Sequence, residues 1–164
     1  MGRFAENTSV SVEKSLAEIK RTLDRYGADQ FGYAEDAARG LASVQFSASD
    51  RHIRFVLSLP NRNDKQFSLT ATGKLRSHDA AIKAWEQACR QRWRALALAI
   101  KAKLEAVEAG ISEFEDEFMA HIVLPGGGTV SQLMRPQIEQ AYLSGDTSSG
   151  IAGLLPAPEE TTTS

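Results

Sequence analysis

Apolar residues in the first part of the chain recur with the period of a helix. The spacing of four, three and four predicts one helix over residues 12–26. The residues that carry this spacing are Val12, Leu16, Ile19 and Leu23. Ser11 is a suitable N-cap, and Gly27 is a suitable residue to end the helix.

The period then changes to the alternation of strands. Alternating apolar and polar residues predict three strands, near residues 30–36, 41–48 and 52–59. The segments between them are short and polar, so an antiparallel meander is expected. Residues 66–72 are a candidate for a short fourth strand.

A helical period returns over a long stretch that begins at Ser77 or Asp79 and ends at Gly110. Its apolar stripe consists of Trp85, Cys89, Trp93, Leu96, Ile100, Leu104 and Val107. A capping box formed by Ser112 and Glu115 predicts a short helix to about His121. A second capping box, Thr129 with Gln132, predicts a last helix to about residue 143, with Pro136 inside it.

These elements predict an α+β fold. A small antiparallel sheet of three to four strands should pack against the long helix and two or three shorter helices. We expect a single domain over residues 12–145. Residues 1–11 and 146–164 are polar or rich in Ser, Thr, Gly and Pro, and we expect both to be disordered.

Composition points to a protein of a reducing cytoplasm. Cys89 is the only cysteine, which excludes an intramolecular disulfide and fits a reducing compartment. The first residues lack the apolar run of a signal peptide. No apolar run approaches the roughly 20 residues that span a bilayer, so no membrane association is expected.

A net charge of −2 hides an uneven distribution along the chain. Residues 51–103 carry a net +9, whereas residues 104–164 carry a net −9. A basic middle segment favours contact with a polyanion such as nucleic acid. The alternative is that Arg90 and Arg94 pair with the acidic segment Glu113–Glu117 inside the protein. The sequence leaves both open.

Two groups of cations are candidates for phosphate contacts. Four lie on one face of the long helix, beside its apolar stripe, at spacings of seven, four and seven. Four others lie at or beyond strand ends, where an antiparallel sheet with a solvated basic face is a known type of nucleic-acid platform. An ordinary polar outer face is the favoured explanation of the second group. The candidates are Arg51, Arg54, Lys74, Arg76, Lys83, Arg90, Arg94 and Lys101.

Other residues that can carry chemistry are better explained as structural. Trp93, among three arginines, could stack on a base, but its place in the apolar stripe favours the core. Glu117 and His121 are four apart and could share a metal ion, but no further ligand is nearby, so a solvated acidic face is favoured. No hydrolase, zinc or phosphate-loop motif is present. We therefore expect no catalytic activity, no cofactor and no metal.

Several segments resemble a set of small proteins encoded by bacteriophages and prophages. The segments that carry this resemblance are residues 17–28, 53–57, 90–96, 100–107 and 136–139. The resemblance covers most of residues 12–143 and implies a phage context in a bacterial host. It implies no functional residues. The order of elements also resembles, at the level of topology alone, double-stranded-RNA-binding domains and the cores of single-strand-annealing proteins.

The sequence thus supports two hypotheses. The first is a non-catalytic, phage-encoded nucleic-acid-binding protein, acting on single-stranded DNA in replication or recombination. The second is an interaction module that binds a host or phage protein, for example as an inhibitor, or that assembles into a homo-oligomer. Exposure of the cationic face of the long helix to solvent would favour the nucleic-acid hypothesis. Coverage of that face by residues 113–117 would favour the interaction hypothesis.

Overall fold

The computed structural model describes residue 5 and residues 7–145. The predicted disorder of residues 146–164 therefore lies outside the described residues, as do residues 1–4 and 6. The chain divides into two units, residues 1–130 and residues 131–164, and each is described by itself.

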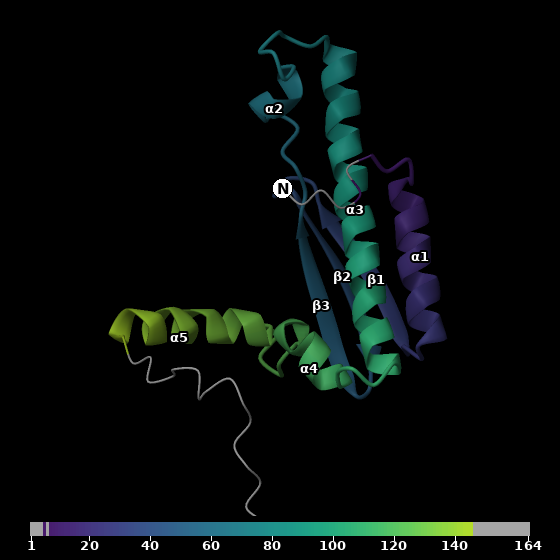
Figure 1. The fold of residues 1–164 in the computed structure, drawn as a ribbon, viewed down its shortest axis with the longest axis vertical. Helices are drawn as coiled ribbons and strands as arrows, with labels where there is room; N and C mark the ends of the chain where they lie inside the picture. Colours follow the sequence, from purple (N-terminus) through teal and green to yellow (C-terminus); the bar gives the residue numbers. More distant parts are fainter. Residues whose placement is uncertain (1–4, 6, 146–164) are drawn as a thin grey trace, which may run out of the picture. The chain divides into compact units, whose positions relative to one another are not determined.

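The first unit is built on a three-stranded antiparallel sheet in the order β1-β2-β3 (Figure 1). Its strands are β1 (Gln30–Asp36), β2 (Leu41–Ala48) and β3 (Arg51–Ser58). The predicted meander is confirmed. Ser49 and Asp50 connect β2 to β3 with φ values of 51° and 57°, the positive pair that a tight two-residue hairpin turn requires.

Two helices, α1 (Val12–Arg25) and α3 (His78–Glu108), lie side by side over one face of this sheet (Figure 1). The Ser11 and Ser77 hydroxyls accept hydrogen bonds from backbone N–H groups of the first turns and so cap both helices. The predicted apolar stripe of α3 is confirmed from Cys89 to Leu104. It packs with the inward residues of α1, β2 and β3 into one core, whose largest fully buried side chains are Trp93, Phe46, Phe118, Ile19, Leu23, Ile53 and Ile100.

Trp85, the first residue of the predicted stripe, is only partly buried. Its indole N–H donates to the carbonyl of Pro60 at 2.8 Å, and the Arg62 guanidinium lies over its ring. Trp85 therefore anchors the connection between β3 and α3 instead of joining the main core.

The expectation of a fourth strand is wrong. Residues 65–68 form one helical turn, α2 (Lys65–Ser68), because this turn buries Phe67, which is 5% exposed. The chain then reverses at Gly73, whose φ is +79°, and Leu69 forms an isolated bridge with Leu75. This bridge is the only trace of the extended pairing that we expected within residues 66–72.

A helical segment follows α3, as predicted, and consists of α4 (Phe114–Phe118) and the 3-10 turn η1 (Met119–His121). The expected capping box is not formed. Glu113 is the N-cap, and the Ser112 hydroxyl instead donates to the Glu113 carbonyl at 3.4 Å. Phe118 is fully buried and packs edge-on against Phe46, so α4 is held by its apolar side.

Helix α5 (Val130–Ser144) begins directly after Thr129, as predicted, and belongs to the second unit from Ser131 onward. Pro136 lies inside this helix. None of the residues of α5 is buried.

Candidate nucleic-acid interface

The four predicted cations of α3 do lie on one flank of this helix, beside its buried stripe. They extend over 18 residues, which is about 27 Å along the axis. Lys83 and Lys101 are exposed, whereas Arg90 and Arg94 are partly buried. Their number and pitch suit a phosphate backbone only where their charges are not already neutralised.

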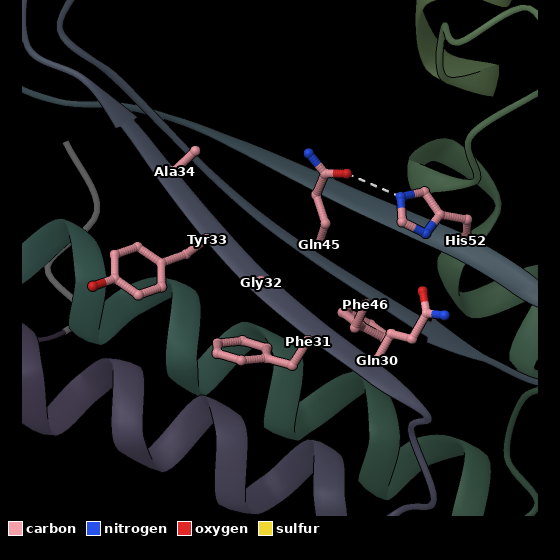
Figure 2. A pocket seen from close by; sticks show the side chains of 8 residues that line it. All are labelled: Gln30, Phe31, Gly32, Tyr33, Ala34, Gln45, Phe46 and His52. Atoms are coloured by element: carbon pink, nitrogen blue, oxygen red, sulfur yellow. Dashed lines mark hydrogen bonds between the residues drawn. The ribbon is translucent and has the colours of Figure 1, made fainter.

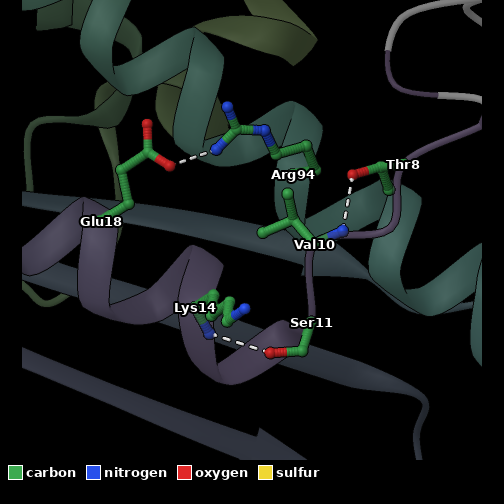
Figure 3. Close-up of polar contacts among 6 residues, drawn as sticks. All are labelled: Thr8, Val10, Ser11, Lys14, Glu18 and Arg94. Carbon is green, nitrogen blue, oxygen red and sulfur yellow. Dashed lines mark hydrogen bonds and ion pairs between the residues drawn. The ribbon is translucent and has the colours of Figure 1, made fainter.

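Arg94 is neutralised within the first unit. Its guanidinium donates to the Glu18 carboxylate of α1 (Figure 3), and the two side chains are only 21% and 28% exposed. Arg94 therefore joins the two helices, and we correct its assignment as a free phosphate ligand.

Arg90 keeps its charge. Its Nε and Nη2 atoms donate to Gln87 Oε1 at 3.0 and 2.7 Å, which orients the guanidinium without neutralising it. Arg92, which was not among the predicted phosphate contacts, is exposed on the opposite flank of α3. Among the described residues, neither arginine has a carboxylate partner within ion-pair distance, and the same holds for Lys101.

The predicted pairing of Arg90 and Arg94 with the acidic segment is wrong. Residues Glu113–Glu117 do neutralise cations, but different ones. Glu115 accepts from Arg51 at 2.5 Å, and Glu117 accepts from Lys103 at 3.1 Å. The acidic segment follows the C-terminal end of α3, so it reaches Lys103 and the start of β3 rather than the middle of the helix.

The candidates at strand ends are also largely engaged. Arg76 Nη1 donates to the carbonyls of Gln66 and Phe67 at 3.3 and 3.2 Å, and so caps the C-terminal end of α2. Lys74 is exposed in the following loop. Arg54 Nη1 donates to the Gly127 carbonyl at 2.8 Å, which ties β3 to the loop before α5.

The sheet face opposite the helices is polar and contains a depression of about 330 Å³ (Figure 2). The paired registers place Gln45 beside Arg54, and Ser47 beside His52, on this face. Gly32 and Ala34 of β1 leave the floor of the depression without bulky side chains. As predicted, Arg54 points away from the apolar face.

A hydrogen-bonded cluster crosses the three strands on this face. His52 Nε2 lies 2.9 Å from Gln45 Oε1, and His52 Nδ1 lies 3.2 Å from Ser47 Oγ. Ser47 Oγ also lies 3.4 Å from Gln30 Oε1. This cluster was not among the residues predicted from the sequence, although the polar residues that alternate with Val44 and Phe46 were its signal.

The structure does not bring the two predicted surfaces together. The cations of α3 lie in the helical layer on one side of the sheet, and the polar depression opens on the other side. Trp93 is 1% exposed, which confirms it as a core residue and removes it as a stacking platform. One extended strand of nucleic acid would therefore contact one surface or the other.

The remaining titratable candidates, His121 and Cys89, lie in packed surroundings that indicate a structural role. His121 stacks on Phe55 with ring centroids 3.9 Å apart, and burial, followed by the charge of Lys103, lowers its pKa. Burial raises the pKa of the Cys89 thiol. Within the described residues, no group of three or more His, Cys, Asp or Glu side chains is placed to hold a metal ion.

Comparison of the chain with family models, with curated proteins and with solved structures finds no match. Among the helices of the described residues, none has the length and apolar character needed to cross a membrane.

Proposed function

We propose that the protein is a non-catalytic nucleic-acid-binding protein that contacts phosphates through the outward surface of α3. The observation that supports this proposal is the charge of one helical segment. Residues 87–104 contain five Lys or Arg and no Asp or Glu. Ion pairs within the described residues neutralise two of these five, Arg94 and Lys103.

The three remaining cations flank the outward face from both sides. Arg90 and Lys101 lie on the flank next to α1, and Arg92 lies on the other flank. Side chains between the flanks are short or uncharged, as in Ala95 and Ala102, so a phosphate backbone meets no repulsion there. Contact of this kind is independent of base sequence and sensitive to salt.

A salt titration tests the proposal directly. Binding of a fluorescent single-stranded oligonucleotide should weaken with salt, with a log–log slope of about −0.7 for each phosphate contact. The triple variant Arg90→Ala, Arg92→Ala, Lys101→Ala should lose affinity and about two units of that slope. Double-stranded DNA and RNA of equal length, measured in parallel, identify the preferred nucleic acid.

A matched variant separates local contact from a general loss of charge. Lys20, Arg25 and Arg39 are exposed and lie in ion pairs on other elements. Their triple alanine variant removes the same formal charge and should keep most of the affinity. Absence of binding by the wild-type protein at low salt and micromolar concentration would reject the proposal.

The second candidate function is protein interaction or self-assembly. It is favoured by a different observation, the exposed apolar residues of α5, and does not depend on nucleic-acid binding.

A further inference from the structure

A depression of about 420 Å³ lies beside α2, in the connection between β3 and α3. The described residues that line it combine two cations with polar and apolar side chains and include no carboxylate. They are Lys65, Gln66, Leu69, Thr70, Ala71 and Arg76. Among the described residues, no carboxylate lies within ion-pair distance of either cation. A concave surface with two cations that are not neutralised is suited to an anion.

The guanidinium of Arg76 is held from one side. Its Nη1 atom donates to the carbonyls of Gln66 and Phe67 at 3.3 and 3.2 Å. The backbone N–H of Arg76 also donates to the Ser68 carbonyl, at 2.8 Å, which fixes the base of the side chain. These carbonyls orient the guanidinium, and they leave its positive charge in place.

The other edge of this guanidinium is formed by Nε and Nη2. Within the part of the chain that the structure describes, these two atoms have no hydrogen-bond partner. Their N–H groups are parallel, which is the geometry that binds two oxygens of one carboxylate or phosphate. Capping of α2 therefore accounts for one nitrogen of Arg76 and leaves a pre-oriented pair of donors for a ligand.

Lys65 supplies the second positive charge of the depression and is exposed. Asp64 is the only acidic residue in residues 61–76, against four Lys or Arg. Its carboxylate accepts from Gln66 Nε2 at 3.3 Å, and Asp64 does not line the depression. The lining thus carries two positive charges with no anion beside them.

We propose that this depression binds a phosphate monoester. A monoester carries close to two negative charges at pH 7, which matches Lys65 and Arg76, whereas a carboxylate or a phosphodiester carries one. The Nε–Nη2 edge of Arg76 binds two phosphate oxygens, and Lys65 pairs with the third. Leu69 and Ala71 provide apolar surface for the organic group of the ester. The proposal does not rest on phosphate contacts by α3.

A titration of the full ¹⁵N-labelled chain with adenosine 5′-monophosphate, followed by NMR at constant ionic strength, tests the site. Backbone amide signals of residues 65–76 and the Nε–H signal of Arg76 should shift and reach saturation. Adenosine, which lacks the phosphate, should leave these signals unchanged. Dimethyl phosphate, which has a single charge, should bind about fivefold more weakly or worse.

Lys65 and Lys74 form a matched pair of test positions. Both are exposed lysines of the same connection, and neither has an ion-pair partner within the described residues. Only Lys65 lines the depression. Lys65→Ala should weaken binding of the monophosphate about fivefold, and Lys74→Ala should leave it nearly unchanged. Arg76→Lys keeps the charge, loses the two parallel donors and should weaken binding about tenfold.

The lysine pair decides the outcome even if Arg76→Lys loosens the cap of α2, because neither lysine side chain caps a helix. Signals of residues 65–76 that do not shift saturably up to about 10 mM monophosphate would overturn the proposal. Equal effects of Lys65→Ala and Lys74→Ala, or equal shifts with adenosine, would overturn it as well.

Two oligonucleotides of one sequence, with and without a 5′-phosphate, separate the sources of such a group. Tighter binding of the phosphorylated strand, lost in Lys65→Ala, would identify the end of a nucleic acid as the ligand. Equal affinity of the two strands, with saturable binding of the mononucleotide, would identify a free small phosphate monoester.

Discussion

Ile100 lies where α3 crosses the core and is fully buried, whereas Ala102, two residues later, is exposed. Ile100→Asp places a carboxylate in an apolar site with no partner. The free-energy cost of burying an unpaired charge exceeds the free energy of unfolding of most small domains. We expect this variant to be unfolded at room temperature. Ala102→Asp adds the same group to the same helix, but at the surface. Its melting temperature, measured by thermal circular dichroism, should lie within a few degrees of the wild-type value. A cooperative Ile100→Asp variant of unchanged melting temperature would contradict the packing described above.

His121 links stability to pH. Its folded-state pKa is lowered from 6.5, mainly by burial. The unfolded chain therefore binds a proton first as pH falls through 6.5, so stability is full above that pH and decreases below it. His121→Phe keeps a ring stacked on Phe55 but cannot titrate. Urea unfolding between pH 7.5 and 5.5 should show a smaller loss of stability for the variant than for wild type. Parallel curves for the two proteins would be evidence against this assignment.

At the scale of elements, α1 and α3 are joined by Glu18 and Arg94, half-buried between the two helices. A double-mutant cycle with Glu18→Gln and Arg94→Met should give a coupling energy of about 1 kcal/mol. Lys20 and Asp24 form an exposed pair within α1 and provide the comparison, with an expected coupling of about 0.3–0.5 kcal/mol. A coupling for Glu18 and Arg94 no larger than that of the exposed pair would show that the contact does not hold the helices together.

The elements themselves were predictable because burial imposes a period on the sequence. The stripe of α3 and the alternation in β2 both follow from one face meeting the core. The conformation of residues 65–68 was not predictable, since one buried side chain, Phe67, decides the conformation of this short segment.

Contacts between residues far apart in the sequence were not predictable either. Nothing local to Arg94 indicates Glu18, which lies 76 residues away, and only the register of the strands brings His52 to Gln45.

For the molecule as a whole, the separation of charge along the sequence is only partly undone by folding. The acidic segment Glu113–Glu117 neutralises Arg51 and Lys103, two of the twelve cations in residues 51–103. The middle of α3 keeps its positive charge. The acidic segment thus limits the extent of the basic surface without covering it.

This arrangement makes a prediction about the whole charge distribution. Glu115→Gln with Glu117→Gln releases Arg51 and Lys103 from their carboxylates, while each amide oxygen can still accept a hydrogen bond. Oligonucleotide affinity at low salt should rise, and the salt slope should become more negative by up to about 1.4 if both cations gain phosphate contacts. Stability should fall by no more than about 1 kcal/mol, because both ion pairs are at least partly exposed. Asp29→Asn with Glu35→Gln removes the same formal charge from exposed positions near β1 and isolates the effect of net charge. If the two double variants bind equally, the acidic segment has no local influence on the basic surface, and its pairing with Arg51 and Lys103 serves only the fold.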